Sequence, residues 1–143
     1  MNLENWKIAV GTAVSAKLHA ERCRFNERSL LRFDIGVFPW HGTIELSLLF
    51  SGEKNFINDI ANWPSYNFSK QQEGKWLEAE VLCKEMAEAW SAKLIAAEAF
   101  FLATADALKA DDVQNAIISF ERSEDFCITL FNPDSPRASN YYI

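Results

Sequence analysis

Glycine and proline are scarce in this sequence, with five and four residues respectively among 143. A chain so poor in the two residues that interrupt helices and strands is not expected to be loop-rich or disordered. Hydrophobic residues make up 49% of the chain, which is enough for a sizeable core without disulfides or a structural metal. The length falls in the usual range of one domain. We therefore expect residues 1–143 to form a single domain.

Cysteine is also sparse, and its spacing gives no disulfide pattern. Cys23, Cys83 and Cys127 are far apart and odd in number. Isolated cysteines are typical of reduced thiols in a cytoplasmic protein. The N-terminus lacks the basic and apolar segments of a signal peptide. No run of residues reaches the roughly 18 apolar positions of a membrane span. The sequence thus predicts a cytoplasmic protein that does not insert in a membrane.

Positive charge is in deficit, because 14 lysines and arginines face 20 aspartates and glutamates, giving a formal net charge of -6. Nucleic-acid binding and adsorption to anionic lipids both require clustered basic residues. Neither nucleic acid nor a membrane is therefore an expected partner. A basic protein is compatible with this charge, since complementary potentials speed and orient association. A modest negative charge also serves solubility alone.

Groups that carry out chemistry are few. The two histidines are His19, in a helical pattern, and His41, in a turn without an adjacent carboxylate. Cysteine and histidine never approach metal-ligand spacing, and all five glycines are solitary, so no phosphate-binding loop is present. Motifs for a serine or cysteine nucleophile are missing as well. We expect no catalytic residue, no metal site and no cofactor, and binding is favoured over an enzymatic role.

The first 50 residues predict a helix followed by a β-hairpin. Over residues 4–27, apolar side chains recur at the spacing of an amphipathic helix. On either side of the turn at residues 39–42 the period changes to two. Pairing Phe38 with Thr43 places apolar residues opposite one another along one face. These pairs are Val37 with Ile44, Ile35 with Leu46, Phe33 with Leu48 and Leu31 with Phe50. A slip of one residue would destroy the match, so the pattern itself specifies this register.

A long helical pattern fills the middle of the chain. Ser69 and Gln72 form a capping-box signature, and apolar residues follow helical spacing over residues 70–109. A straight helix of that length would measure about 60 Å. A compact domain of this size should be only roughly 35–40 Å across. We predict one helix or a helix pair, and favour a break near Ser91.

After this helical pattern the alternation returns and predicts a second β-hairpin. Its paired residues are Ile118 with Leu130 and Phe120 with Ile128. Two hairpins with helices between them predict an α+β fold. The expected architecture is a four-stranded antiparallel sheet, with the N-terminal helix and the long central helix or helix pair packed on one face. The C-terminal residues 141–143 should be loose unless they dock.

Large aromatic side chains in turns and connections are the main functional signal. Such segments normally lie on the surface, and Trp and Tyr are enriched as interface anchors. Trp63 and Phe68 are expected to fold back over the core. The other aromatic candidates join polar side chains of the outer sheet face, which would offer an acidic surface to a basic partner. The predicted partner-binding set is Trp40, His41, Tyr66, Asp34 and Glu45.

Two stretches of the sequence resemble small bacterial α+β proteins of the toxin-immunity type. They are residues 34–50, with the turn Pro39-Trp40-His41-Gly42, and the later run from Trp63 to Phe68. The resemblance covers less than a third of the chain. It implies a cytoplasmic protein that binds one cognate toxin and blocks it by occlusion, without catalytic residues.

The sequence leaves two functions open. The first is a protein-binding domain, with an antitoxin-like inhibitor of a basic toxin as its specific form. The alternative is a small-molecule-binding protein or enzyme with a pocket between sheet and helices, where His41 or Asp34 would stand at the mouth. A homodimer formed through the long helix would also account for the length of that helix.

Overall fold

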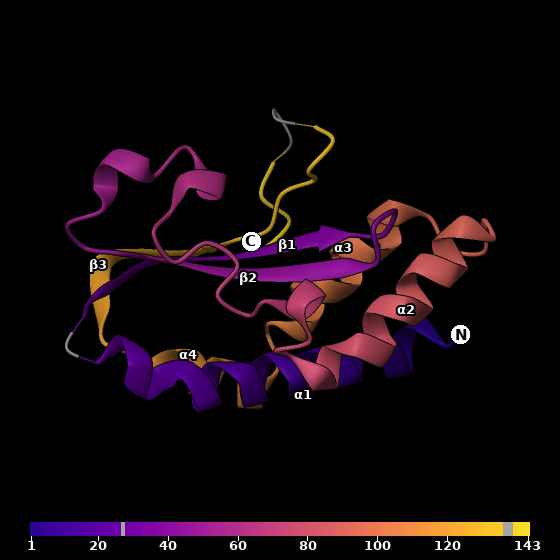
Figure 1. Cartoon of the computed structure of the whole chain (residues 1–143), viewed down its shortest axis with the longest axis horizontal. Coiled ribbons are helices and arrows are strands. Elements are labelled where there is room, and N and C mark those ends of the chain that lie inside the picture. Colours follow the sequence, from indigo (N-terminus) through magenta and orange to yellow (C-terminus); the bar gives the residue numbers. More distant parts are fainter. Residues whose placement is uncertain (27, 136–138) are drawn as a thin grey trace.

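The computed structural model describes residues 1–26, 28–135 and 139–143, and within these residues a three-stranded sheet forms the middle of three layers (Figure 1). The helices cover one face of the sheet, and two irregular segments cover the other, which we call the outer face. The helices are α1 (Leu3–Glu21), α2 (Leu77–Ser91), α3 (Ala97–Ala107) and α4 (Asp111–Ile118). The strands are β1 (Leu30–Phe38), β2 (Thr43–Phe50) and β3 (Arg122–Thr129).

Helix α1 confirms the predicted N-terminal helix. The Asn2 side chain accepts a 2.9 Å hydrogen bond from the N–H of Asn5 and so caps the first turn. Trp6 is buried and donates its indole N–H to the carbonyl of Leu82, which ties α1 to α2. The α-helix ends before the predicted limit and continues as the 3₁₀ turn Arg22–Phe25, while residue 27 lies outside the described residues.

The first hairpin forms in the predicted register. β1 and β2 are antiparallel, and Phe38 lies opposite Thr43. The next apolar pairs along the strands are also as predicted: Val37–Ile44, Ile35–Leu46 and Phe33–Leu48. All six of these apolar side chains are buried. One face of the hairpin therefore forms the sheet's contribution to the main core.

The predicted register fails at the first pair of the hairpin. A β-bulge places Leu30, rather than Leu31, opposite Phe50. Leu31 instead packs with Leu49 and Trp63 in a small hydrophobic cluster apart from the main core. The extra residue lets one leucine leave the helix-facing side and anchor the segment that crosses the outer face.

The central helical pattern is a helix pair, as favoured. α2 ends at Ser91, and Lys93 adopts a left-handed conformation with φ 58° before α3 begins. The predicted capping box is wrong, because α2 begins after the left-handed residues Lys70 and Gly74. Ser69 serves another purpose, since its hydroxyl accepts a 3.0 Å hydrogen bond from the β2 backbone. With the helix broken, its length no longer argues for a homodimer.

The predicted second hairpin is wrong. Strand β3 pairs with β1 in parallel, with Phe33 opposite Ile128 and Asp34 opposite Thr129, and the strand order is β2-β1-β3. Among the described residues the sheet is therefore three-stranded and mixed, not four-stranded and antiparallel. A parallel pair needs a long crossover, which the helices between β2 and β3 supply.

The first strand expected for that hairpin falls at the end of helix α4 and in the turn that follows it. Val113, Ala116 and Ile117 are buried and follow the spacing of one helix face, and Phe120 continues that spacing just beyond the helix. Asp111 and Asp112 stand in the first turn, where negative charge favours a helix N-terminus. The alternation of apolar and polar residues around residue 118, which predicted a strand, is the end of this helical pattern.

The C-terminal residues dock on β3. The Tyr141 N–H donates a 2.8 Å hydrogen bond to the carbonyl of Leu130. The Asn140 side chain accepts from the N–H of Leu130 and donates to the carbonyl of Ile128, at 2.8 and 2.9 Å. Tyr141 and Tyr142 pack against the main core. In the described part of the chain, no helix has both the length and the apolar character needed to cross a bilayer.

Candidate binding surface on the outer face

The outer face carries a strip of polar side chains contributed by all three strands. Asp34 lies opposite Ser47 on β2 and Thr129 on β3, and Gly36 lies opposite Glu45. Alternating residues of a strand share a face, so these positions meet on the side away from the helices. The strip is not the open acidic surface that the sequence predicted. The segment after β2 and the segment after β3 cover it, leaving Asp34 only 6% and Glu45 only 8% exposed.

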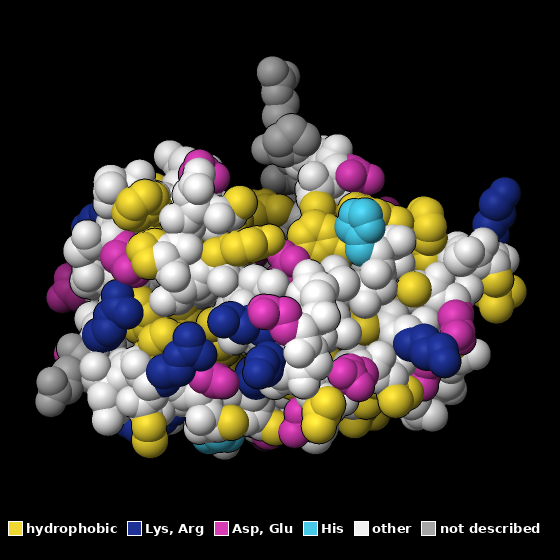
Figure 2. Space-filling model, viewed as in Figure 1, with side chains coloured by type: hydrophobic (Ala, Val, Ile, Leu, Met, Phe, Trp, Pro, Cys, Tyr) yellow, Lys and Arg dark blue, Asp and Glu magenta, His cyan; other side chains and the backbone are white. Residues whose placement is uncertain are grey.

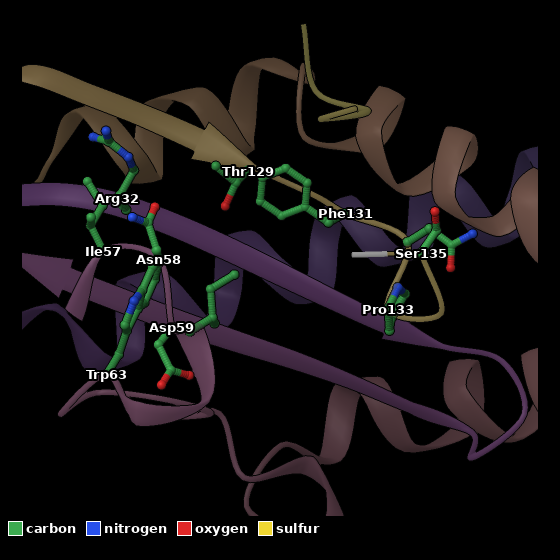
Figure 3. Close-up of a pocket in the computed structure, with 11 residues that line it drawn as sticks. Arg32, Ile57, Asn58, Asp59, Trp63, Thr129, Phe131, Pro133 and Ser135 are labelled. Carbon is green, nitrogen blue, oxygen red and sulfur yellow. The ribbon is translucent and has the colours of Figure 1, made fainter. Parts of the chain in front are cut away.

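Two adjoining hollows lie between this strip and the covering segments. The larger has a volume of about 610 Å³ and runs from Arg32 past Thr129 to Pro133 (Figure 3). The smaller has a volume of about 300 Å³ and is lined by Asp34 and Glu45. Both are bordered by the same three residues, which are Ile60, Phe131 and Pro133. We call the two hollows together the outer cleft.

Asp34 is the most perturbed acid of the cleft. Its Oδ1 accepts a 2.6 Å hydrogen bond from the Thr129 hydroxyl. Burial and, to a smaller extent, the charge of Glu45 raise the pKa of its carboxyl group, while the Thr129 hydrogen bond lowers it. The net pKa is about 7. At neutral pH the floor of the cleft therefore holds a carboxyl group close to its titration midpoint.

Glu45 is held by two donors from the covering segment. The Tyr66 hydroxyl donates to its Oε1, and the Gln72 side-chain amide donates to its Oε2 at 2.8 Å. The same environment raises the pKa of Tyr66, first through burial and then through its hydrogen bond to Glu45. Both carboxylate oxygens of Glu45 are thus engaged, and Tyr66 stays a hydrogen-bond donor at neutral pH.

The backbone on both sides of Tyr66 is fixed to the edge of β2. The Leu48 N–H donates to the carbonyl of Ser65 at 3.2 Å, and the Asn67 N–H donates to the Ser47 hydroxyl at 2.8 Å. Tyr66 remains 38% exposed at the mouth of the cleft. This pairing also covers part of an otherwise open strand edge.

An aromatic cluster adjoins the cleft at the β1–β2 turn. Phe38 lines the smaller hollow, and its ring centroid lies 6.3 Å from those of Trp40 and His41. Trp40 lies 6.3 Å from Trp90 of α2. A Cβ atom on Gly36 would stand 2.8 Å from the Phe38 ring, so the ring lies directly over that glycine. The phenylalanine therefore forms both a wall of the cleft and one end of the aromatic cluster.

Figure 2 shows hydrophobic side chains on the surface above the sheet, with acidic side chains between them. Within residues 1–26, 28–135 and 139–143, no three histidine, cysteine or acidic side chains gather in a way that could hold a metal ion. The chemical character of the site is thus a polar, acidic floor with an aromatic rim. Such a surface can accept hydrogen-bond donors and cations and can pack against apolar groups.

The chain matches no family model, no curated protein and no solved structure. The resemblance to toxin-immunity proteins therefore stays a prediction, carried by the residues quoted for it.

The five predicted site residues fall into two adjoining groups. Asp34, Glu45 and Tyr66 meet in the outer cleft, while Trp40 and His41 stand at the turn and do not line it. Trp63 and Phe68 are buried, as expected, but only Phe68 packs in the main core, whereas Trp63 lies in the separate small cluster on the outer face. Sequence reasoning missed four residues of the surface: Phe38, Gln72, Thr129 and Phe131. Only the first had a usable signal, since it shares the face of positions 34 and 36.

Proposed function

We propose that this protein binds another protein through the outer cleft and the adjoining aromatic cluster, and acts by occupying its partner rather than by chemistry. The position of Phe38 carries this proposal. Its ring closes one end of the acidic cleft and contacts the cluster that contains Trp40 and His41. Cleft and cluster therefore form one continuous surface, larger than either part alone.

The composition of this surface suits a protein interface. Large aromatic side chains that are partly exposed supply most of the binding energy in many interfaces. Tyr66, Trp90 and Phe131 each expose more than a third of their surface along the cleft and the turn. The acidic floor and the net charge of -6 favour a partner with a basic face. An antitoxin-like inhibitor of a basic toxin is the specific form of this proposal, supported by the resemblance of the turn at residues 39–42.

A small-molecule ligand is the second candidate. The larger hollow, at about 610 Å³, falls in the range of about 300–1,000 Å³ that is usual for ligand pockets. This pocket lies on the outer face and not between sheet and helices, and His41 is not among its lining residues. Asp34 lines only the smaller, adjoining hollow. Metabolite-specific stabilisation in a thermal-shift screen would favour this candidate, because a ligand that binds only the folded state raises the unfolding temperature.

The experiment that tests the proposal is affinity capture with matched variants. Tagged wild-type protein, a Trp40→Ala/Tyr66→Ala double variant and a Leu102→Ala control are compared at equal loading. Leu102 is exposed on α3, on the opposite side of the sheet. We expect a stoichiometric partner with the wild type and the control, and its loss with the double variant. Capture that is equal for all three forms would contradict the proposed surface.

A further inference from the structure

Asp34 Oδ2, in the outer cleft, has no hydrogen-bond partner in the described part of the chain. The other carboxyl oxygen, Oδ1, accepts from Thr129. Asp34 is only 6% exposed, yet its Oδ2 is not among the fully enclosed unpaired atoms, so it keeps access to the hollow. A buried carboxylate normally gains a donor or a counter-charge. Here the hollow stands where that donor would be.

Basic side chains do not neutralise this floor within the described residues. The ion pairs formed by the described residues involve neither Asp34 nor Glu45. Among residues 1–26, 28–135 and 139–143, the donors to Glu45 are the neutral groups of Tyr66 and Gln72. Two carboxyl groups therefore share a partly dry site without a cation, which is why burial and the charge of Glu45 both raise the pKa of Asp34.

The walls of the smaller hollow are suited to a cation. Phe38, Tyr66 and Phe131 line it from three separate segments of the chain. The faces of aromatic rings attract ammonium groups, and more strongly so when water is excluded. Ile60 and Pro133 add apolar surface on which an alkyl chain can pack. The hollow thus combines a carboxylate floor with aromatic and aliphatic walls.

We infer that the smaller hollow of the outer cleft receives the side-chain ammonium group of a lysine presented by the partner protein. This inference rests on the proposed function and names the chemistry of the group that enters the cleft. A lysine ammonium is a compact charge with three donors that rotate freely, so one of them can reach the single free oxygen, Asp34 Oδ2. Arginine fits less well, because its two parallel donors call for two free oxygens on one carboxylate. The carboxylates of Glu45 and Asp34 together leave one free oxygen, which is Asp34 Oδ2.

A peptide-sized probe tests the inference without the partner. Full-length ¹⁵N-labelled protein is titrated with Nα-acetyl-lysine-N-methylamide, with its norleucine analogue and with its arginine analogue. We expect saturable amide shifts at Gly36, Phe38 and Thr129 with the lysine probe. The norleucine probe lacks the charge, and its affinity should be at least about tenfold lower, as expected for a lost hydrogen bond to a charged group. The arginine probe should fall between them.

Two variants test whether binding of the lysine probe depends on the free oxygen of Asp34. Asp34→Asn should weaken the lysine probe about tenfold while keeping the hydrogen bond from Thr129, and Glu88→Gln, at an exposed position on α2, should leave the affinity unchanged. Thermal unfolding of each variant verifies that it is folded. Equal binding of the lysine and norleucine probes would overturn the inference. So would unchanged lysine affinity in folded Asp34→Asn.

The outcomes separate this inference from the proposed function. If the lysine probe does not bind but capture still depends on Trp40 and Tyr66, the lysine site is wrong and the protein-binding surface stands. If the lysine probe binds as expected but no partner is captured, the lysine site stands and the proposed function is wrong.

Discussion

The Thr129 hydroxyl donates a 2.6 Å hydrogen bond to Asp34 Oδ1, between residues 95 positions apart in the chain. These residues lie opposite each other where β1 and β3 run in parallel. The bond satisfies one oxygen of the carboxyl group and leaves the other to the outer cleft. The titration of Asp34 should therefore be measurable both in the stability of the fold and in binding.

The contribution of Asp34 to protein stability should fall as pH rises from about 4 to about 7. The folded protein holds the Asp34 proton with a pKa of about 7, whereas the unfolded chain releases it near the ordinary aspartate pKa of 3.8. Between these values the native state binds more protons, so each pH unit costs up to about 1.4 kcal/mol of unfolding free energy from this group. Asp34→Asn should remove this dependence and raise stability at pH 8. Urea unfolding at pH 5 and pH 8 measures both effects.

Thr129→Val provides the matched control for that titration. The hydroxyl stabilises the ionised carboxylate, so removing it should move the Asp34 pKa higher than in the wild type. Carboxyl ¹³C NMR across the pH range reports this shift directly. An Asp34 that titrates near the value for an exposed aspartate in the wild type would contradict the cleft as described.

Alanine substitutions at two glycines should separate surface shape from stability. At Gly36 the new methyl group meets the Phe38 ring, a half-exposed side chain that can swing away. Gly36→Ala should therefore cost less than about 1 kcal/mol but displace the ring from the cleft. Gly42 has φ +64°, and a Cβ atom there would lie 3.3 Å from the Cys83 carbonyl oxygen, so Gly42→Ala should cost about 1–2 kcal/mol or more.

Denaturant titration and NMR of the Phe38 ring check this pair of glycine variants. If Gly36→Ala leaves the ring signals and the contact with Trp40 unchanged, Phe38 is not the link between the cleft and the aromatic cluster. If Gly42→Ala proves as stable as the wild type, the turn is not packed on α2 as described.

Asn140→Ala should loosen the C-terminal segment from β3. Its side chain joins the backbone of Ile128, Leu130 and Tyr142 through three hydrogen bonds of 2.8 to 3.0 Å. Removing the Asn140 partner of these three backbone groups should cost about 1–3 kcal/mol. Amide hydrogen exchange at Leu130 should accelerate. Ser139→Ala, at the exposed neighbouring position, is the control and should behave as the wild type.

The three cysteines should differ sharply in reactivity. Cys83 is buried, and burial raises the pKa of its thiol to about 12. Cys23 and Cys127 are exposed. A thiol reagent at pH 8 should modify two groups quickly and the third only on unfolding, because the thiolate is the reacting form. Cys83→Ala should leave the number of fast groups at two. Three fast groups in the folded wild type would contradict the packing of α2 on β2.

Local alternation was enough to predict the first hairpin, whereas the break of the central helix was predicted from the expected diameter of the domain. The register from Phe38–Thr43 to Phe33–Leu48 follows from alternation within a single stretch of chain. The bulge at Leu31 could not be read there, because its cause is a cluster with Trp63, which is distant in sequence. Short apolar repeats also misled, since the pattern around residue 118 fits both a strand and the end of α4.

The candidate site was predictable only in part, for a similar reason. Asp34, Glu45 and Tyr66 were selected from face parity and loop position, and the structure brings them together. Their burial, and the role of Thr129, depend on the parallel strand and on two covering segments. Those are long-range contacts that composition and spacing do not encode.

Hydrogen–deuterium exchange of the captured complex tests the central claim most directly. Exchange is compared between the free protein and the protein bound to its partner, segment by segment. We predict that binding protects residues 34–40, 63–68 and 129–133 on the outer face, and leaves the exposed side of α1 and α3 unchanged. Protection confined to α1 and α3 would contradict the assignment of the outer cleft and the aromatic cluster as the binding surface.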